Sequence, residues 1–354
     1  MPLKNSYAVW NNKGGVGKST ITFHIASRYA QLHPNEKVLV IDLCPQANSS
    51  MMLLGGGEAG ERQVIAFCTE QAPPTVAGYL SYVLSAGPMA PLPPHQNYLK
   101  RVADYNREIP SNTYLLCGDG NLEPMSPLIS AQAGMAPLTS ASNPWLWVHQ
   151  IFRTLIGKLS EGPEDWVIFV DTNPSFSIYT EIAISSVDKL IVPVNADDSS
   201  RVATNAMFTL IYGANPPHPI YGAYTFANKA NQLNLPRPVV HLIVGNRLTQ
   251  NMGAAAAFEA VSDATAESLF YAYQQNPGHF TPYAKLLKTI NAFRTAYSLP
   301  LRDFNTAGVV AAHSGRPLSN LPSGNYDVYG TNVQVSVVRV RECLDAIDNV
   351  VARL

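Results

Sequence analysis

Residues 6–20 read SYAVWNNKGGVGKST, and this stretch decides the fold class. A strand-like run at 7–11 leads into a glycine-rich turn, and a helical pattern follows at 18–32. A strand, a turn and a helix in this order are the setting of a phosphate-binding loop, whose usual pattern is G-x-x-x-x-G-K-[ST]. That pattern calls for a glycine at position 12, but the chain has Asn12 there, followed by an extra lysine, Lys13.

The glycine-rich turn is predicted to bind the phosphates of ATP. Its glycines leave backbone N–H groups free to converge on phosphate oxygens, and the N-terminus of the following helix adds positive potential. Lys18 would reach the β- and γ-phosphates, and the Ser19 hydroxyl would bind Mg²⁺. The residues predicted to contact the nucleotide here are Lys13, Gly14, Gly15, Val16, Gly17, Lys18, Ser19 and Thr20.

Two aspartates end apolar, strand-like runs elsewhere in the chain. Asp42 closes VLVID, and Asp171 closes WVIFVD. A carboxylate at such a strand end, beside a phosphate loop, can hold magnesium through water. The sequence therefore predicts a magnesium site made by Ser19, Asp42 and Asp171.

The remaining strand-like runs define the fold class. They lie at 37–42, 113–117, 166–171, 189–194 and 239–245, and further helical patterns lie at 145–160 and 254–275. Most runs are continuous and β-branched, which is typical of parallel strands buried on both faces. We expect an α/β fold with a doubly wound, mostly parallel sheet and helices on both faces.

The length of 354 residues fits a single domain spanning 1–354. Residues 55–112 form a long connection rich in glycine and proline, and we expect a partly helical insertion with flexible ends, with a helix at GYLSYVLS. Apolar residues at spacings of three and four predict a last helix at about 332–354 that packs on the sheet. These apolar residues are Val337, Val340, Leu344, Ile347, Val351 and Leu354.

The composition limits the function classes. The net charge of −1 excludes a polycation made to hold nucleic acid, although a local basic patch stays open. The four cysteines form no C-x-x-C, which disfavours a metal cluster within one chain and favours a reducing cytoplasm. The eight histidines show no ligand spacing, and no apolar stretch approaches the ~20 residues of a membrane span. We expect a cytoplasmic protein whose metal is nucleotide-bound magnesium.

Several distinctive motifs lie along the chain. They are KGGVGKST, IDLCPQANSS, DTNPSFS and DKLIVPVNAD, followed by GNRL at 245–248 and AGVVAAHSGRPL near the C-terminus. Together these motifs resemble the ParA/MinD ATPases with a deviant Walker A motif, and most closely the ParA branch, which positions plasmids, chromosomes and large cargo. They run from residue 7 to about 320, and 55–112 is the least matched part.

The resemblance implies an ATP-dependent homodimer in which Lys13 of each subunit crosses to the phosphates of the other. Such a cation couples nucleotide state to dimerisation. It also implies that Asn246 and Arg247 recognise adenine, that Lys13 and Asp42 are catalytic, and that a protein partner and non-specific DNA binding are to be expected. A solvated surface lysine is the alternative for Lys13.

The chain departs from the family at Cys44. The family usually has D-x-D-P-Q after the second strand, and its second aspartate helps to activate the attacking water. A neutral thiol accepts a water proton poorly, so hydrolysis is expected to be very slow or partner-dependent while ATP binding and dimerisation survive. The alternative is that another carboxylate, Asp197 or Asp198, takes the place of the missing one.

Two sequence features each allow two interpretations. The basic residues after 284 could form a phosphate-binding stripe in a dimer or be scattered solvated charges. They are Lys285, Lys288, Arg294, Arg302, Arg316, Arg339, Arg341 and Arg353. The aromatic run at 270–283 could be a partner surface or, more commonly, core packing.

Two functions therefore remain. The first is an ATP-dependent dimerising switch of the ParA type that positions DNA or other cargo. The second is a scaffold that uses ATP only as a structural ligand, for example in a DNA defence or conjugation complex. A reductase with a shared iron–sulfur cluster is disfavoured because no cysteine lies in the expected place. A membrane-bound relative is disfavoured by the acidic residues of the last helix, and no membrane partner is expected.

Overall fold

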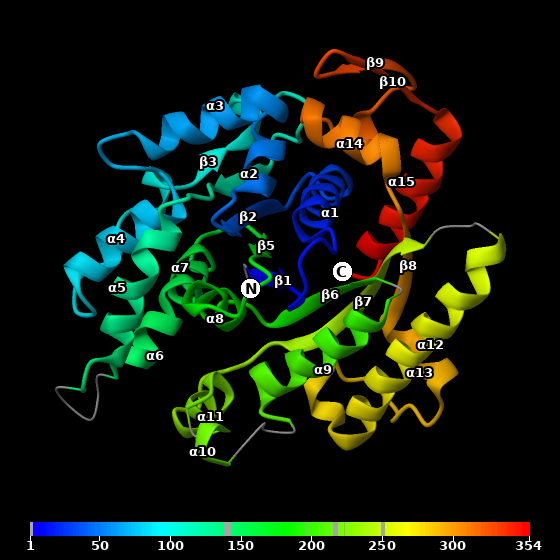
Figure 1. Cartoon of the computed structure of the whole chain (residues 1–354). Coiled ribbons are helices and arrows are strands. Elements are labelled where there is room, and N and C mark those ends of the chain that lie inside the picture. Colours follow the sequence, from blue (N-terminus) through cyan, green and yellow to red (C-terminus); the bar gives the residue numbers. More distant parts are fainter. Residues whose placement is uncertain (1–2, 138–142, 196, 215–218, 223, 249–251) are drawn as a thin grey trace.

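The computed structural model describes residues 3–137, 143–195, 197–214, 219–222, 224–248 and 252–354. An eight-stranded sheet with the order β3-β4-β2-β5-β1-β6-β7-β8 forms its centre (Figure 1). All neighbouring strands are parallel except β3, which runs antiparallel to β4. The strands are β1 (Leu3–Val9), β2 (Lys37–Leu43), β3 (Lys100–Arg101), β4 (Thr113–Leu116), β5 (Trp166–Thr172), β6 (Lys189–Asn195), β7 (Val239–Leu248) and β8 (Ser298–Arg302).

Helices cover both faces of this sheet. One face packs against α1 (Lys18–Leu32), α2 (Asn48–Leu53), α3 (Gly57–Cys68), α14 (Asn305–Ser314) and α15 (Val337–Val351). The other packs against α4 (Val76–Ala86), α5 (Leu122–Gly134), α6 (Pro144–His149), α7 (Ile151–Leu159), α8 (Ile178–Ser185), α9 (Asp198–Tyr212), α11 (Phe226–Gln232), α12 (Met252–Gln275) and α13 (Ile290–Tyr297). The short helix α10 spans Pro219–Gly222. The doubly wound α/β class predicted from the sequence is confirmed.

Alternation along the central strands produces these two cores. Tyr7 and Val9 of β1 point into the core that contains α1, whereas Ala8 points into the core on the opposite face. All seven residues of β5 are buried. Successive side chains of a strand point to opposite faces, so a strand with helices on both sides must be apolar throughout. This explains why continuous apolar runs predicted the strands well.

Some predicted boundaries differ from those observed. The first strand is Leu3–Val9 rather than 7–11, and the helical run 145–160 divides at Gln150 into α6 and α7. Residues 332–335, expected in the last helix, belong to β10 (Thr331–Val335), which pairs with β9 (Gly324–Val328). This hairpin is mostly exposed and polar, and β3 has only two residues, so neither gave a strand-like apolar run.

The segment 55–112 is firmly attached where it begins. A Cβ atom on Gly56 would lie 2.3 Å from the carbonyl oxygen of Ala312 and 2.3 Å from the backbone nitrogen of Gly315. Only glycine, which also tolerates the φ of 70° found there, allows this turn to lie against the end of α14. The Asn106 side chain adds hydrogen bonds to the carbonyl oxygens of Leu53 (2.9 Å) and Gly315 (2.8 Å). We call this contact the glycine clamp. The helix expected at GYLSYVLS is α4.

The aromatic run at 270–283 contributes mainly to the core. Tyr273 and Phe280 are almost fully buried and pack with Phe293 in one aromatic cluster. Tyr271 and Tyr283 are exposed. The core-packing interpretation of this run therefore holds for its central residues.

Candidate nucleotide-binding site

The glycine-rich loop lies at the carboxyl end of β1, between β5 and β6 in the middle of the sheet. Gly15 and Gly17 have φ angles of 70° and 81°, a region that glycine adopts without strain. A Cβ atom on Gly17 would also lie 2.6 Å from the Asn246 side chain. The helix α1 begins at the next residue, Lys18. The loop therefore has the shape that the sequence predicts for binding an anion at a helix N-terminus.

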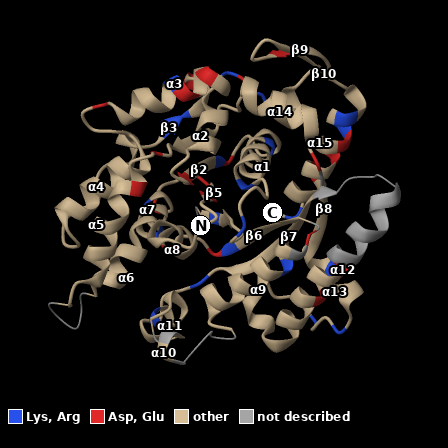
Figure 2. Ribbon diagram, viewed as in Figure 1, with Lys and Arg blue, Asp and Glu red and all other residues tan. Residues whose placement is uncertain are grey.

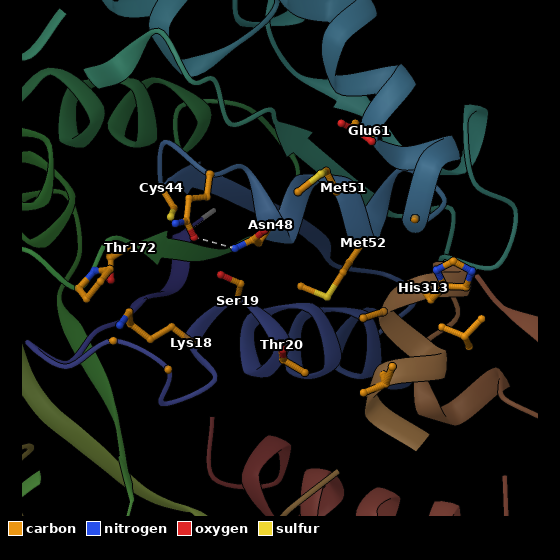
Figure 3. A pocket seen from close by; sticks show the side chains of 18 of the residues that line it. Lys18, Ser19, Thr20, Cys44, Asn48, Met51, Met52, Glu61, Thr172 and His313 are labelled. Carbon is orange, nitrogen blue, oxygen red and sulfur yellow. Dashed lines mark hydrogen bonds between the residues drawn. The ribbon is translucent and has the colours of Figure 1, made fainter. Parts of the chain in front are cut away.

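A cavity of about 770 Å³ opens beside this loop (Figure 3). That volume lies within the range of small-molecule sites. Its walls come from the loop and the start of α1, from the β2–α2 turn, from β5, from α3, and from α14 with the β9–β10 hairpin. The lining residues include Lys18, Ser19, Thr20, Cys44, Gln46, Asn48, Glu61, Thr172, His313 and Tyr329.

Lys18 is buried at the inner end of this cavity. Its Nζ donates to the carbonyl oxygens of Lys13 (2.8 Å) and Asn11 (3.3 Å). Burial lowers the pKa of Lys18 to about 8, while the nearby Asp171 and Cys44 act in the opposite direction. The side chain remains mostly a cation at neutral pH, so it can exchange these carbonyl contacts for phosphate oxygens.

Asp42 and Asp171 lie opposite each other on β2 and β5, and both are fully buried. Burial and the neighbouring Asp42 raise the pKa of Asp171 to about 7, whereas the hydroxyls of Ser19 and Ser49 and the charge of Lys18 lower it. Asp171 accepts a 3.0 Å bond from the Thr172 amide, and among the described residues its Oδ2 atom has no partner.

Of the three residues predicted to hold magnesium, Ser19 and Asp171 have a geometry that fits the ion. A buried carboxylate oxygen without a protein partner, close to the Ser19 hydroxyl, is a donor set suited to hydrated Mg²⁺. Asp42 is bound differently, since it accepts hydrogen bonds from the Ser50 amide (2.9 Å), the Ser50 hydroxyl (2.7 Å) and the Cys44 amide (3.1 Å). Asp42 thus holds the β2–α2 turn in place, and its role toward magnesium and catalysis stays a prediction.

Cys44 lines the cavity on the same side as Ser19 and Thr172. Burial, together with Asp42 and Asp171, raises the pKa of the Cys44 thiol to about 12. The thiol is therefore neutral at physiological pH, and it is a weak acceptor of a water proton. Cys44 occupies the position predicted from the motif, close to the predicted magnesium site.

The Lys13 side chain is held by an ion pair outside the set of residues that line the cavity. Its Nζ contacts Asp197, the residue that caps α9. Asp197 does not line the cavity either, and the Asp198 side chain lies outside the described residues. The proposal that Asp197 replaces the missing aspartate near the phosphates therefore gains no support from this arrangement.

The predicted adenine contacts are placed only in part. Asn246 is buried, and its Nδ2 donates to the carbonyl oxygen of Val16 at 2.8 Å. This hydrogen bond stabilises the conformation of the glycine-rich loop. The Arg247 side chain lies outside the described residues. Adenine recognition by these two residues stays a prediction.

Several cavity residues escaped the sequence prediction. Gln46 and Asn48 belong to a quoted motif and share a 3.1 Å hydrogen bond. Glu61 and His313 come from α3 and α14 (Figure 3). Tyr329 comes from the β9–β10 hairpin. No local pattern marks Glu61 or Tyr329. His313 lies within the quoted motif AGVVAAHSGRPL, but the motif indicates no role for it, because only the folding of distant segments brings it to the cavity.

Within the described ranges, no group of three or more His, Cys, Asp or Glu side chains is placed to hold a metal ion. In the same ranges, no helix combines the length and the apolar character that crossing a bilayer requires.

The fold and the loop define a P-loop nucleotide-binding protein. The chain belongs to the CobQ/CobB/MinD/ParA nucleotide-binding domain family, whose model, CbiA, matches residues 7–346. This is the family that the motifs predicted. A search of curated proteins finds no match.

Solved structures with similar folds include partition-type proteins. A Cyanothece McdA variant in complex with ATP has 13% identity and a TM-score of 0.56, covering 99% of this chain and 95% of that chain. Apo McdA has 16% identity and a TM-score of 0.53, covering 90% and 92%. A protein of Borrelia burgdorferi described as a plasmid partition protein, bound to AMPPNP, has 15% identity and a TM-score of 0.50, covering 99% of both chains. At such identities these likenesses show the fold.

Proposed function

We propose that this protein is a ParA-like switch in which two chains dimerise around ATP and Mg²⁺ and the dimer positions DNA or another large cargo. The observation that carries the proposal is the pair of lysines in one phosphate loop. Lys18 lines the cavity beside the loop, whereas Lys13 does not and its ammonium is paired with Asp197. A cation that does not serve its own nucleotide can transfer to that of a second chain, and its charge favours ATP over ADP there.

The residues of this chain divide the work of binding. The N–H groups of the loop, the N-terminus of α1 and Lys18 bind the phosphates, and Thr20 extends the same wall. Ser19 and Asp171 hold Mg²⁺, which would neutralise phosphate charge. The similar McdA and Borrelia proteins were solved with ATP and AMPPNP, and we extend nucleotide binding to this chain on the shared fold.

Hydrolysis in this proposal is slow or needs a partner. A base that activates water must accept a proton near the phosphates, and Cys44 is a neutral thiol at that position. A stimulating protein partner would supply or position the missing group. The four free cysteines suit a reducing compartment, so we place the protein in the cytoplasm.

Few basic side chains after residue 284 are available to bind DNA phosphates. Several of the basic residues after 284 are already bound, because Arg294 pairs with Asp263, Arg316 with Glu108 and Arg339 with Glu342. Lys285, Lys288 and Arg341 are exposed and have no ion-pair partner among the described residues, and the Arg302 side chain lies outside them. Figure 2 shows Lys and Arg spread over many elements rather than gathered on one. DNA binding, if part of the function, would be weak and sensitive to salt.

Cys44 also favours a second function. If the thiol prevents hydrolysis altogether, ATP would hold a constant dimer, and the protein would be a scaffold within a larger complex such as a DNA defence or conjugation system. The two functions differ in one property. A switch changes its oligomeric state with the nucleotide, whereas a scaffold does not.

Light scattering after size exclusion tests the proposal with ATP and Mg²⁺, with ADP and Mg²⁺, and without nucleotide. We expect the measured mass to be that of a dimer with ATP and Mg²⁺, and that of a monomer with ADP and Mg²⁺ or without nucleotide. Lys18→Ala should remove this response, and Lys158→Ala, which changes a surface lysine paired with Glu161, should not. A dimer in all three conditions would indicate the scaffold, and a monomer in all three would contradict both functions.

A further inference from the structure

The Lys13–Asp197 ion pair joins the phosphate loop to the start of α9. The Lys13 ammonium contacts Oδ2 of Asp197, and the two side chains are 21% and 42% exposed. The other carboxylate oxygen, Oδ1, accepts bonds from the Ser200 amide (2.8 Å), the Ser199 hydroxyl (2.8 Å) and the Ser200 hydroxyl (3.0 Å). One carboxylate therefore has two separate tasks, since one oxygen holds the lysine and the other caps the helix.

The same loop residue also restrains Lys18. The Lys13 carbonyl oxygen accepts a 2.8 Å bond from Lys18 Nζ, while the Lys13 side chain is directed to Asp197. Burial raises the pKa of Asp197, but hydrogen bonds from Lys13, Ser199 and Ser200 outweigh burial and lower this pKa to about 2. The carboxylate is therefore ionised at any physiological pH. In the single chain, Lys13 is thus bound to its own subunit.

We propose that Asp197 is a positioning residue that retains Lys13 on its own subunit until ATP-dependent dimerisation draws the lysine away. This inference rests on the proposed function, in which Lys13 reaches the nucleotide of a second chain. The ammonium cannot remain paired with Asp197 and at the same time extend to the partner's phosphates. Dimerisation must therefore break one such pair in each subunit, and the pair opposes the dimer.

The expected size of the effect follows from the exposure of the pair. Partly exposed ion pairs change an equilibrium by up to about fivefold. A symmetric dimer breaks two pairs, so the two factors multiply to at most about 25-fold in the dimer dissociation constant. The effect should depend on ATP, because only the γ-phosphate gives Lys13 a stronger partner in the other chain.

Asp197→Asn is the variant that separates the two tasks. Asparagine caps helices as well as aspartate does, so the α9 cap is kept while the charge that holds Lys13 is removed. We expect the dimer dissociation constant with ATP and Mg²⁺, measured by sedimentation or light scattering over a concentration series, to fall by up to about 25-fold. Asp263→Asn is the matched control, because it removes a similarly exposed pair with Arg294 and should leave the constant unchanged.

A second measurement in the Lys13→Ala variant distinguishes an effect through Lys13 from a purely structural effect of Asp197. In that background Asp197→Asn should have no effect on association, and with ADP it should have none in either background. Asp197→Ser, another capping residue without charge, repeats the test should the asparagine variant fold poorly. Unchanged or weaker ATP-dependent association in both variants, with the native chain dimerising, overturns the role of Asp197 alone. A native chain that never dimerises with ATP contradicts the proposed function, and this inference with it.

Discussion

Asp42 and Asp171 are cross-strand neighbours whose carboxylates have different partners. Asp42 accepts one hydrogen bond from Cys44 in the β2–α2 turn and two from Ser50 in α2, whereas Asp171 keeps one buried oxygen without a partner among the described residues. Two buried carboxylates side by side disfavour each other's ionisation. The free protein therefore stores electrostatic repulsion at the place where a cation is expected, and magnesium binding would relieve it.

The pH dependence of stability should reveal this repulsion. Aspartate in the unfolded chain loses its proton near pH ~4, whereas folded Asp171 keeps it to about 7. Between these values the folded state binds more protons, so the free energy of unfolding falls as the pH rises from ~4 to ~7. Asp171→Asn should reduce this loss of unfolding free energy. Part of the loss should remain, because burial also raises the pKa of Asp42. Urea unfolding across this window, without nucleotide or metal, measures the slope, and an identical slope in the variant would show the inference to be wrong.

Restoring the family's aspartate should restore hydrolysis. Cys44→Asp places a proton acceptor beside the phosphates, and groups of this kind contribute on the order of a hundredfold or more in rate. We expect the steady-state ATPase rate to rise by about that factor. Cys68→Asp, at a cysteine that does not line the cavity, is the control. A native chain that already hydrolyses at the family's stimulated rate, with no change in Cys44→Asp, would contradict the role assigned to the thiol.

Ser19→Ala should weaken the contribution of magnesium to ATP binding. The Ser19 hydroxyl lies in the cavity near Asp171, where it is predicted to hold the ion. Calorimetric titration with ATP, with and without Mg²⁺, should show the metal-dependent gain in affinity reduced tenfold or more, about 1.4 kcal/mol. Ser27→Ala removes a buried hydroxyl elsewhere in α1 and should keep the gain. Equal gains in both variants would exclude Ser19 as a ligand.

Ser50 should matter for stability rather than for chemistry. Its hydroxyl donates to Asp42 at 2.7 Å and accepts from the Gly118 amide at 2.8 Å. Ser50→Ala leaves a buried carboxylate and a buried N–H short of partners, which should cost about 2–4 kcal/mol of unfolding free energy. Ser81→Ala, at an exposed serine of α4, should cost less than about 0.5 kcal/mol. Denaturant unfolding compares the two, and a loss below ~1 kcal/mol for Ser50→Ala would argue against this account.

Gly60 is the clearest test of how α3 is attached. A Cβ atom there would lie 2.1 Å from the backbone oxygen of Met51, so Gly60→Ala must push α2 and α3 apart. We expect a loss of about 1–3 kcal/mol, the usual cost of overpacking. At Gly134 in α5 a Cβ atom meets nothing within 4 Å, and Gly134→Ala should be neutral or slightly stabilising. Equal unfolding midpoints for both variants would contradict the close packing.

The sequence was most informative where the chemistry is local. The loop from Lys13 to Thr20 is a continuous motif, and the buried strands β2, β5, β6 and β7 are continuous apolar runs, so their positions were predicted within a few residues. It was less informative where contacts join distant segments. The pairing of Lys13 with Asp197 spans 184 residues and depends on β6 lying beside β1. The bonds of Asp42 to Ser50 depend on the turn into α2, and His313 and Tyr329 reach the cavity only through the fold.

The glycine clamp has a mechanical consequence. The turn at 55–57 lies directly against the end of α14, where backbone atoms of the two segments meet, so α2, this turn and α14 behave as connected parts. At one end of these connected parts, Ser50 of α2 is hydrogen-bonded to Asp42. At the other end, the exposed Tyr329 ring packs edge-on against His313 of α14. We expect a displacement of α2 to pass through these backbone contacts to α14 and to the β9–β10 hairpin beside it, on the exposed side of the cavity.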